Sequence, residues 1–335
     1  MAKIGVLGAG GWALALSITL NHENHEITVW SKVKSELDEI RQTGQNSRSL
    51  PGVDIPKSIK LTEDLKEVVS SSEILIMAVA SPYVRSTARE IAQLNIKGLK
   101  IVNVAKGIEE HSLMTMTQII EDEIKDVTVA VLSGPSHAEE VSRFLPTTCV
   151  IGTKEKDFAA YLQEIFTNKV FRIYINPDII GIELGGSLKN VIALAAGVAD
   201  GLGYGDNTKA ALITRGIHEI ARLGIAMGGK LQTFYGLSGI GDLIVTCASM
   251  HSRNRRAGIL IGQGKTMDEA MEEVHMVVEG VHSAKAAYAL SLKYNVEMPI
   301  IEMIYKILFK NIPIEQVTGE LMLREPKEEN YDLPW

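Results

Sequence analysis

Short apolar runs alternate with helical patterns over the first part of the chain. The runs typical of buried strands are Lys3–Leu7, Glu26–Trp30, Ile74–Val79, Lys100–Val104 and Val127–Leu132. Helical patterns over Trp12–Leu20 and Lys32–Arg41 follow the first two runs. Strands joined by helices run parallel, because the chain must cross back over the sheet before it starts the next strand. This part therefore predicts an α/β fold, a Rossmann-type doubly wound sheet with helices on both faces.

The pattern changes at Asn176-Pro177, and from there to Lys310 we find no convincing strand. Pro177–Leu202 predicts one long helix with many glycines, each costing about 1 kcal/mol relative to alanine, which suits a central helix with closely packed neighbours. Further helical patterns cover Asn207–Leu223, Arg255–Ile261, Met267–Glu273, Ser283–Tyr294 and Met298–Phe309. We therefore expect two domains: a dinucleotide-binding domain over residues 1–178 and an all-α substrate domain over residues 179–335.

Composition excludes several classes of function. The 335 residues carry 34 basic and 41 acidic side chains, a formal charge of −7. Nucleic acids and anionic lipid headgroups require a basic face that this balance does not favour. The two cysteines are far apart, the first residues do not resemble a signal peptide, and no uncharged apolar stretch reaches the roughly 18 residues that span a bilayer. We expect a cytoplasmic protein without membrane insertion, whose acidic tail Glu325–Trp335 is irregular.

A glycine-rich turn follows the first strand. Gly8-Ala9-Gly10-Gly11-Trp12-Ala13 has the form G-x-G-x-x-A, a variant of the dinucleotide-binding fingerprint. Gly8 allows the tight turn, Gly10 lets the backbone approach a pyrophosphate, and the following helix presents unpaired N–H groups to it. The alternative is a glycine-rich turn without a ligand, but its place between a strand and a helix favours binding.

The end of the second strand bears on the choice of dinucleotide. A site selective for NAD often has a carboxylate there for the ribose 2′-hydroxyl. Here the strand ends Trp30-Ser31-Lys32, and the first carboxylate comes at Glu36. Lys32 could face a 2′-phosphate, which slightly favours NADP over NAD, unless it is simply solvated.

Two lysines occur where a structural role explains them poorly. Lys106 directly follows a strand, and ligands of open α/β sheets lie beyond the carboxyl ends of strands. The segment Gly134-Pro135-Ser136-His137-Ala138 occupies the same position after the next strand. Lys189 and Asn190 lie inside the long small-residue helix, where a lysine is rarely buried without a partner or a function. The alternative is that Lys189 reaches the surface along its aliphatic stem.

Two further segments carry polar groups that need partners. Asp242 lies among apolar residues in Tyr235–Cys247, whose glycines predict an irregular backbone, and a carboxylate there needs a cation or hydrogen-bond donors. Ser252-Arg253-Asn254 directly precedes a helical pattern and suits a phosphate, although an ordinary helix cap with a solvated basic turn is the alternative. His22 and His25 lack a ligand cluster, so we expect no metal, and Cys247 reads as an inert buried thiol.

In combination these segments resemble the NAD(P)-dependent glycerol-3-phosphate dehydrogenases of bacteria over essentially the whole chain. The resemblance is carried by GAGGWALAL at Gly8–Leu16, AKGIE at Ala105–Glu109, SGPSHAEEV at Ser133–Val141, ELGGSLKNVIALAAGVADGLGYGDNTKAALITRG at Glu183–Gly216, FYGLSGIGDLIVTC at Phe234–Cys247, HSRNRRAG at His251–Gly258 and VVEG at Val277–Gly280. The chain departs from the family pattern at Gly11, Ala13 and Ser49. These departures bear on cofactor preference and affinity and leave the proton-transfer residues untouched.

The resemblance implies a reaction and a set of residues for it. The reaction is the reversible reduction of dihydroxyacetone phosphate to sn-glycerol 3-phosphate for phospholipid synthesis, and a homodimer is implied as well. Lys189 would be the catalytic acid and base. The implied substrate contacts are Lys106, Gly134, Ser136, Lys189, Asp242, Ser252, Arg253 and Asn254. The implied dinucleotide contacts, besides Gly8 and Gly10 of the turn, are Gly11, Trp12, Lys32, Lys106, Ala138, Arg253, Val277 and Glu279.

Protonated Lys189 would donate to the ketone oxygen in reduction and would have to be neutral for oxidation, which requires a pKa below the free value of about 10.4. We expect Lys106 and the bound nicotinamide to lower that pKa and Asp242 to orient the lysine. Two other functions fit part of the pattern. A related dehydrogenase acting on a β-hydroxyacid or ketopantoate would not need Ser252-Arg253-Asn254, and a non-catalytic nucleotide sensor would not need both lysines.

Overall fold

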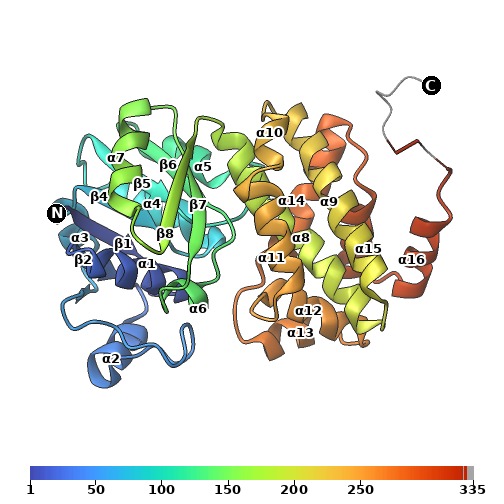
Figure 1. Cartoon of the computed structure of the whole chain (residues 1–335), viewed down its shortest axis with the longest axis horizontal. Coiled ribbons are helices and arrows are strands. Elements are labelled where there is room, and N and C mark those ends of the chain that lie inside the picture. Colours follow the sequence, from blue (N-terminus) through green and yellow to red (C-terminus); the bar gives the residue numbers. More distant parts are fainter. Residues whose placement is uncertain (327, 330–335) are drawn as a thin grey trace.

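The computed structural model describes residues 1–326 and 328–329, which form two halves lying side by side (Figure 1). The N-terminal half consists of β1 (Lys3–Leu7), α1 (Gly11–His22), β2 (Glu26–Trp30), α2 (Lys34–Thr43), β3 (Lys60–Thr62), α3 (Leu65–Ser71), β4 (Ile74–Met77), a 3₁₀ turn η1 (Ser81–Tyr83), α4 (Val84–Ala92), β5 (Leu99–Asn103), α5 (Met116–Glu123), β6 (Val127–Ser133), α6 (Ala138–Val141), β7 (Thr147–Gly152), α7 (Lys156–Phe166) and β8 (Phe171–Asn176). All five strands expected from the sequence are present.

The strands form one eight-stranded sheet in the order β3-β2-β1-β4-β5-β6-β7-β8. Alternate residues of each central strand enter two separate cores, because helices cover both faces. In β4, Ile74 and Ile76 pack into the core beneath α1, α2 and α7, whereas Leu75 and Met77 pack into the core beneath α3, α4 and α5. The doubly wound architecture predicted from the sequence is therefore confirmed.

The sheet is not parallel throughout, and it contains three strands that the sequence analysis did not predict: β3, β7 and β8. β7 runs antiparallel to β6, because the segment between them contains only the short helix α6 and does not cross back over the sheet. α7 then provides a crossover, so β8 pairs parallel to β7. The expected parallel sheet thus ends at β6, and an oppositely directed pair extends it towards the second half.

The C-terminal half is helical. Its elements are α8 (Ile179–Gly201), α9 (Asp206–Ala226), α10 (Leu231–Phe234), a π-helical turn η2 (Leu237–Gly241), α11 (Asp242–Ala248), α12 (Arg253–Gly262), α13 (Met267–Val274), α14 (Glu279–Tyr294), α15 (Pro299–Lys310) and α16 (Ile314–Met322). Asp178 caps the start of α8, since its carboxylate accepts a hydrogen bond from the N–H of Gly181 at 3.0 Å. Within the described residues after Asn176 there is no strand, as expected.

α8 is the central helix of this half, and its glycines allow a backbone to approach it. A Cβ atom on Gly197 would collide with the carbonyl of Arg255 in α12, and one on Gly258 of α12 would collide with the carbonyl of Leu194. α8 is also long and apolar enough to cross a membrane, but 94% of its apolar window is buried inside the protein, which identifies a core helix.

The segment around Asp242 differs from its prediction. It was expected to be irregular, but η2 and α11 make it helical from Leu237 onward. The glycines serve packing instead, because a Cβ on Gly239 would collide with the backbone of Phe234. α10 and α16 were not predicted either. In the tail, the described residues after α16 are irregular, and residues 327 and 330–335 lie outside the described part.

Candidate active site

Two lysines from different halves of the protein meet around one carboxylate. Lys189, in the middle of α8, donates hydrogen bonds through Nζ to Oδ1 of Asp242 and, at 2.7 Å, to Oγ1 of Thr246. Lys106, in the loop after β5, donates to Oδ2 of Asp242 at 2.6 Å. The structure thus brings together three residues that the sequence analysis selected from separate segments.

Burial controls the electrostatics of this cluster. The side chains of Asp242 and Lys189 are only 1% and 7% exposed, so the lysine does not reach the surface, while that of Lys106 is 20% exposed. Burial lowers the pKa of Lys189 to about 8, Asp242 opposes this change, and the charge of Lys106 reinforces it. Burial alone would raise the pKa of Asp242, but the two ammonium groups outweigh it and hold that pKa below its usual range. The cluster therefore presents a net positive charge and a lysine that can change protonation near neutral pH.

Thr246 is a member of the cluster that the sequence analysis missed. Its hydroxyl accepts from Lys189 and donates to the carbonyl oxygen of Asp242, one turn earlier in α11, at 2.6 Å. The spacing of four residues places Asp242 and Thr246 on one face of a helix. That signal was hidden because the segment was expected to be irregular.

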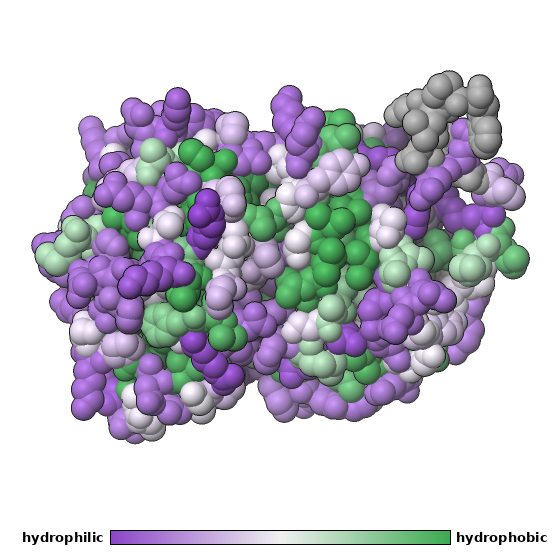
Figure 2. All heavy atoms as spheres, viewed as in Figure 1, coloured by the Kyte–Doolittle hydropathy of each residue, from purple (hydrophilic) through white to green (hydrophobic). Residues whose placement is uncertain are grey.

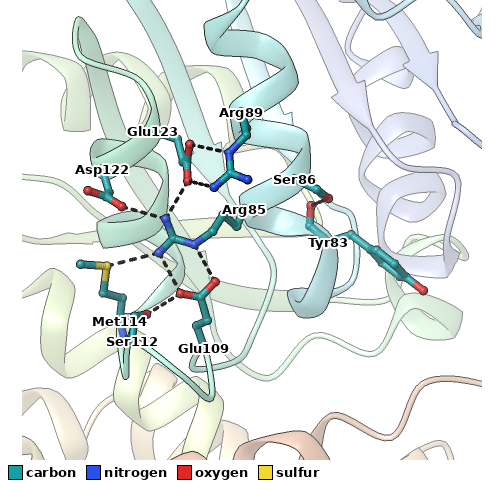
Figure 3. A network of polar contacts seen from close by, with 9 residues as sticks. All are labelled: Tyr83, Arg85, Ser86, Arg89, Glu109, Ser112, Met114, Asp122 and Glu123. Atoms are coloured by element: carbon teal, nitrogen blue, oxygen red, sulfur yellow. Dashed lines mark hydrogen bonds and ion pairs between the residues drawn. The ribbon is translucent and has the colours of Figure 1, made fainter.

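The loop that carries Lys106 is anchored by Arg85 of α4 (Figure 3). Arg85 forms a bidentate pair with Glu109, three residues after Lys106, with N···O distances of 2.7 and 2.8 Å. It also bonds Asp122 and Glu123 of α5, each at 2.7 Å, and Arg89 pairs with Glu123. This network joins the loop to two helices and accounts for Glu109 in the AKGIE motif.

The turn after β6 forms one wall beside the lysines. Gly134 has a φ of +143°, and a Cβ there would lie 3.0 Å from Cα of Cys149, so the position requires glycine. Its carbonyl accepts from Ser136 Oγ at 2.9 Å and from Lys106 Nζ at 3.3 Å. Next in the turn, burial and then the charge of Lys189 lower the pKa of His137.

The start of α12 forms another part of the site. Ser252 caps the helix by accepting from the N–H of Arg255 at 3.2 Å, so its hydroxyl proton is not used in the cap. The Arg253 guanidinium donates to the carbonyl of Val277 at 3.4 Å. Burial lowers its pKa, while Glu279 and Glu139 oppose that change. A partly buried guanidinium with spare donors at a helix N-terminus suits an anion.

Asn254 has a structural task in this region. Its Nδ2 donates to Oδ1 of Asn190 at 2.9 Å, and its Oδ1 accepts from the N–H of Gly280 at 2.8 Å. The amide therefore fastens α12 to α8 and α14. One N–H of the amide remains for the substrate contact expected from the sequence.

The glycine-rich turn fits a dinucleotide phosphate. Gly8 has a φ of +123°, and its Cβ would lie 2.9 Å from the carbonyl oxygen of Ala78. A Cβ on Gly10 would meet nothing within 4 Å, so the space next to the α1 N-terminus is open. A Cβ on Gly11 would collide with the carbonyl of Ser49 and would lie 3.6 Å from Cβ of Ala138. Trp12 packs against Phe171 of β8, and the centroids of the two rings are 6.5 Å apart.

The surroundings of Lys32 differ from the expectation that it is free to meet a 2′-phosphate. Its Nζ lies 2.7 Å from Oε1 of Glu90, although 72% of the side chain is exposed. Glu36 accepts from Ser31 Oγ at 2.8 Å, so a carboxylate does lie at the end of β2. The sequence distance from Ser31 to Glu36 concealed this contact.

Glu279, at the start of α14, joins the two halves. Its carboxylate accepts from the N–H of Ser81 at 3.1 Å and from the hydroxyl of the same residue, and burial raises its pKa. Glu279 also lies next to the loop that carries Lys106, because a Cβ on Gly107 would lie 3.6 Å from its Oε2. Glu279 and Val277 therefore lie where the halves meet, near Arg253.

The two thiols do not contribute chemistry. Cys149 and Cys247 are both buried and free, and burial raises the pKa of each to about 12. Thiols in this state are poor nucleophiles, as expected for Cys247. No group of three or more His, Cys, Asp or Glu among the described residues is arranged to hold a metal ion.

Comparison with known proteins agrees with this geometry. Residues 3–159 match the family model for the NAD-dependent glycerol-3-phosphate dehydrogenase N-terminus, and residues 178–319 match that for the C-terminus. A glycerol-3-phosphate dehydrogenase [NAD(P)+] of Fusobacterium nucleatum is 57% identical over 331 residues, 98% of this chain and 99% of that protein. One from Agathobacter rectalis is 56% identical over the full length of both chains.

A solved structure extends the match to three dimensions. The crystal structure of glycerol-3-phosphate dehydrogenase from Coxiella burnetii superposes with a TM-score of 0.93 and 35% sequence identity. The match covers 96% of this chain and 99% of that one. With both halves matched in sequence and in fold, the chain belongs to the NAD-dependent glycerol-3-phosphate dehydrogenase family.

Proposed function

We propose that this chain reduces dihydroxyacetone phosphate to sn-glycerol 3-phosphate with NADH or NADPH, reversibly, and that Lys189 exchanges the proton. The assignment rests on Lys189, which is buried and hydrogen-bonded to Asp242 and Thr246. Burial lowers the pKa of this lysine to about 8. The relatives described above are glycerol-3-phosphate dehydrogenases [NAD(P)+], which supports the same reaction.

The residues present fit a dinucleotide. Gly8, Gly10 and the N-terminus of α1 would hold its pyrophosphate, and when bound it supplies the hydride that reaches C2 of the ketone. As negative charge develops on the ketone oxygen, the ammonium of Lys189 stabilises it and transfers a proton to it. In the reverse direction, neutral Lys189 accepts the proton of the C2 hydroxyl. Lys106 adds positive charge beside the oxygen and keeps Asp242 ionised.

The substrate phosphate would lie at the start of α12. Ser252 offers a hydroxyl, Arg253 a partly buried guanidinium, and the first turn of the helix its N–H groups. This anchor would fix the distance from the phosphate to C2 and hold the ketone at Lys189. Gly134, Ser136, Asp242 and Asn254 complete the proposed substrate set. The proposed dinucleotide set adds Gly11, Trp12, Lys32, Ala138, Val277 and Glu279.

The test is loss of NADPH or NADH absorbance at 340 nm with dihydroxyacetone phosphate and then with unphosphorylated dihydroxyacetone. Turnover of the phosphorylated ketone alone supports the proposal. Turnover of a β-hydroxyacid or ketopantoate instead would identify the related dehydrogenase. Dinucleotide binding without turnover of any of these compounds would identify the nucleotide sensor.

We further propose a functional division at residue 178, a cytoplasmic location and a homodimer. We also propose a modest preference for NADP, which rests on the exposed Lys32 and is opposed by the carboxylate of Glu36 at the end of β2. Apolar side chains gather on one face of the helical half, over α9, α11 and α14 (Figure 2). Exposed apolar residues of this half include Ile225, Leu231, Tyr235 and Ile244, a kind of surface that often marks an interface. Light scattering after size-exclusion chromatography tests the dimer, and Ile244→Asp tests the surface.

A further inference from the structure

One polar atom beside the lysine cluster has no role in the mechanism above. Nε2 of His137 is buried from solvent and has no hydrogen-bond partner in the described part of the chain. His137 ends the turn that follows β6, between Ser136 and the first residue of α6. A buried ring nitrogen without a partner costs free energy, so its position needs an explanation outside the folded chain itself.

The surroundings of this imidazole place it across from the start of α12. Its ring faces that of His251 with centroids 5.7 Å apart and an angle of 53° between the planes. His251 is exposed and directly precedes Ser252, the cap of α12. The N-terminal half therefore contributes His137 to the same place where the C-terminal half contributes the start of α12.

Charged groups from every side act on His137. Lys189 of α8 disfavours a positive imidazole, and Glu139 and Glu140 of α6 together with Asp242 of α11 favour one. Burial is the largest influence and, with Lys189, keeps the ring neutral at neutral pH. A neutral imidazole carries one N–H, so Nε2 can act as a hydrogen-bond donor without bringing another buried charge.

We propose that His137 is a substrate-positioning residue whose Nε2–H donates a hydrogen bond to a phosphate oxygen of the substrate. The phosphate would then be held from both halves, by Ser252 and Arg253 on one side and by His137 on the other. Lys189 and Lys106 would hold the carbonyl end, and the contact with His251 places His137 next to Ser252 at the start of α12, where the phosphate would lie. This inference rests on the proposed function for the identity of the substrate.

The proposal predicts a specific pattern of kinetic changes. His137→Leu retains much of the side-chain volume but has no donor, and it should raise both KM for dihydroxyacetone phosphate and Ki for inorganic phosphate about 10-fold. His137→Gln carries an N–H at similar reach and should stay within about 3-fold of the wild type. kcat and KM for the dinucleotide should change little in both variants. His22→Leu, on the surface at the end of α1, is the matched control.

Several results would overturn the assignment. Equal KM and Ki in the Leu variant and the wild type would exclude the hydrogen bond. An equal rise in the Leu and Gln variants would indicate packing, and a rise in KM for the dinucleotide alone would place His137 at the cofactor. If the Leu variant does not fold, Gln and Ala variants provide the same comparison. Calorimetric binding of inorganic phosphate tests His137 even if the wild type proves inactive on dihydroxyacetone phosphate.

Discussion

The ammonium of Lys189 and the carboxylate of Asp242 are paired inside the protein, with only 7% and 1% of their side chains exposed. Breaking a buried pair by removing one partner typically costs 3–5 kcal/mol, because the other charge is left uncompensated. A buried ion pair contributes little to the net stability of the fold, and its role here is to set the charge state and the orientation of the lysine. In this protein it fixes the Nζ atom that we assign to proton transfer.

Removing the lysine tests its chemical role. Lys189→Met retains the length of the side chain and removes the proton donor, so kcat for reduction should fall about 10²- to 10⁴-fold. Binding of the dinucleotide should persist, because Gly8 and Gly10 lie elsewhere. Steady-state kinetics and a dinucleotide titration measure the two effects. Turnover at the wild-type rate would remove Lys189 from the mechanism.

The pKa of Lys189 predicts opposite pH profiles for the two directions. Reduction uses the protonated lysine, so its kcat should fall as the pH rises through about 8, whereas kcat for oxidation should rise over the same range. Asp242 raises the pKa of Lys189, so Asp242→Asn should move both inflections to lower pH. Initial rates over a pH series in both directions measure this shift. A shift to higher pH would contradict the electrostatic assignment.

Much of this arrangement could be predicted from the sequence, because the signals were local. Strands such as Ile74–Met77 are buried on both faces and read as continuous apolar runs. β8 alternates buried and exposed residues at the end of the sheet, with Tyr174 and Ile175 exposed, and β3 has only three residues. These strands depend on their neighbours for pairing and so lack a strong signal of their own.

The site divides in the same way. Lys189 could be found because a lysine stood out in a small-residue helix. Lys106 could be found because it directly follows a strand, and Asp242 because a carboxylate among apolar residues needs a partner. Thr246 depends on α11 being helical, and Glu36 reaches Ser31 only because the chain turns into α2. His137 gave no sequence signal that separated it from the rest of its motif. Contacts that depend on the path of the backbone were the ones missed.

Thr246 should act through Lys189. Thr246→Val preserves the shape of the side chain but removes the acceptor for Nζ and the donor to the Asp242 carbonyl, so kcat should fall about 10-fold with little change in KM. Thr246→Ser restores the hydroxyl and should recover most of the rate. If Val and Ser variants lose equal activity, the hydroxyl is not the cause. A shifted pH profile in the Val variant alone would support the positioning role.

The ion pair between Lys32 and Glu90 bears on the choice of dinucleotide. Glu90→Gln releases Lys32 from its partner and should lower KM for NADPH relative to that for NADH by a few-fold, because surface pairs contribute at most about 1 kcal/mol. Lys32→Asp should shift the ratio the other way. The measurement is kcat/KM with each dinucleotide. Equal losses with both would show that Lys32 does not meet a 2′-phosphate.

Glu219 predicts a pH dependence of stability away from the site. It is 2% exposed, and its carboxylate accepts from the N–H groups of Ile300 at 2.9 Å and Ile301 at 3.3 Å, at the start of α15. Burial raises the pKa of Glu219 to about 7, although the two hydrogen bonds favour the ionised form and lower that pKa. Because the folded-state pKa lies above the unfolded value, the favourable contribution is complete at low pH and is lost as the pH rises through about 7.

Glu219→Gln retains an acceptor but cannot ionise. Between about pH 5 and pH 8 its free energy of unfolding should therefore rise by about 1–3 kcal/mol relative to that of the wild type. Urea unfolding at both pH values measures the difference, with exposed Glu26→Gln as the control. If instead the wild type became more stable relative to the variant as the pH rises, the ionised carboxylate would be the form that the start of α15 stabilises. The dipole of α15 would then outweigh the cost of burying the charge.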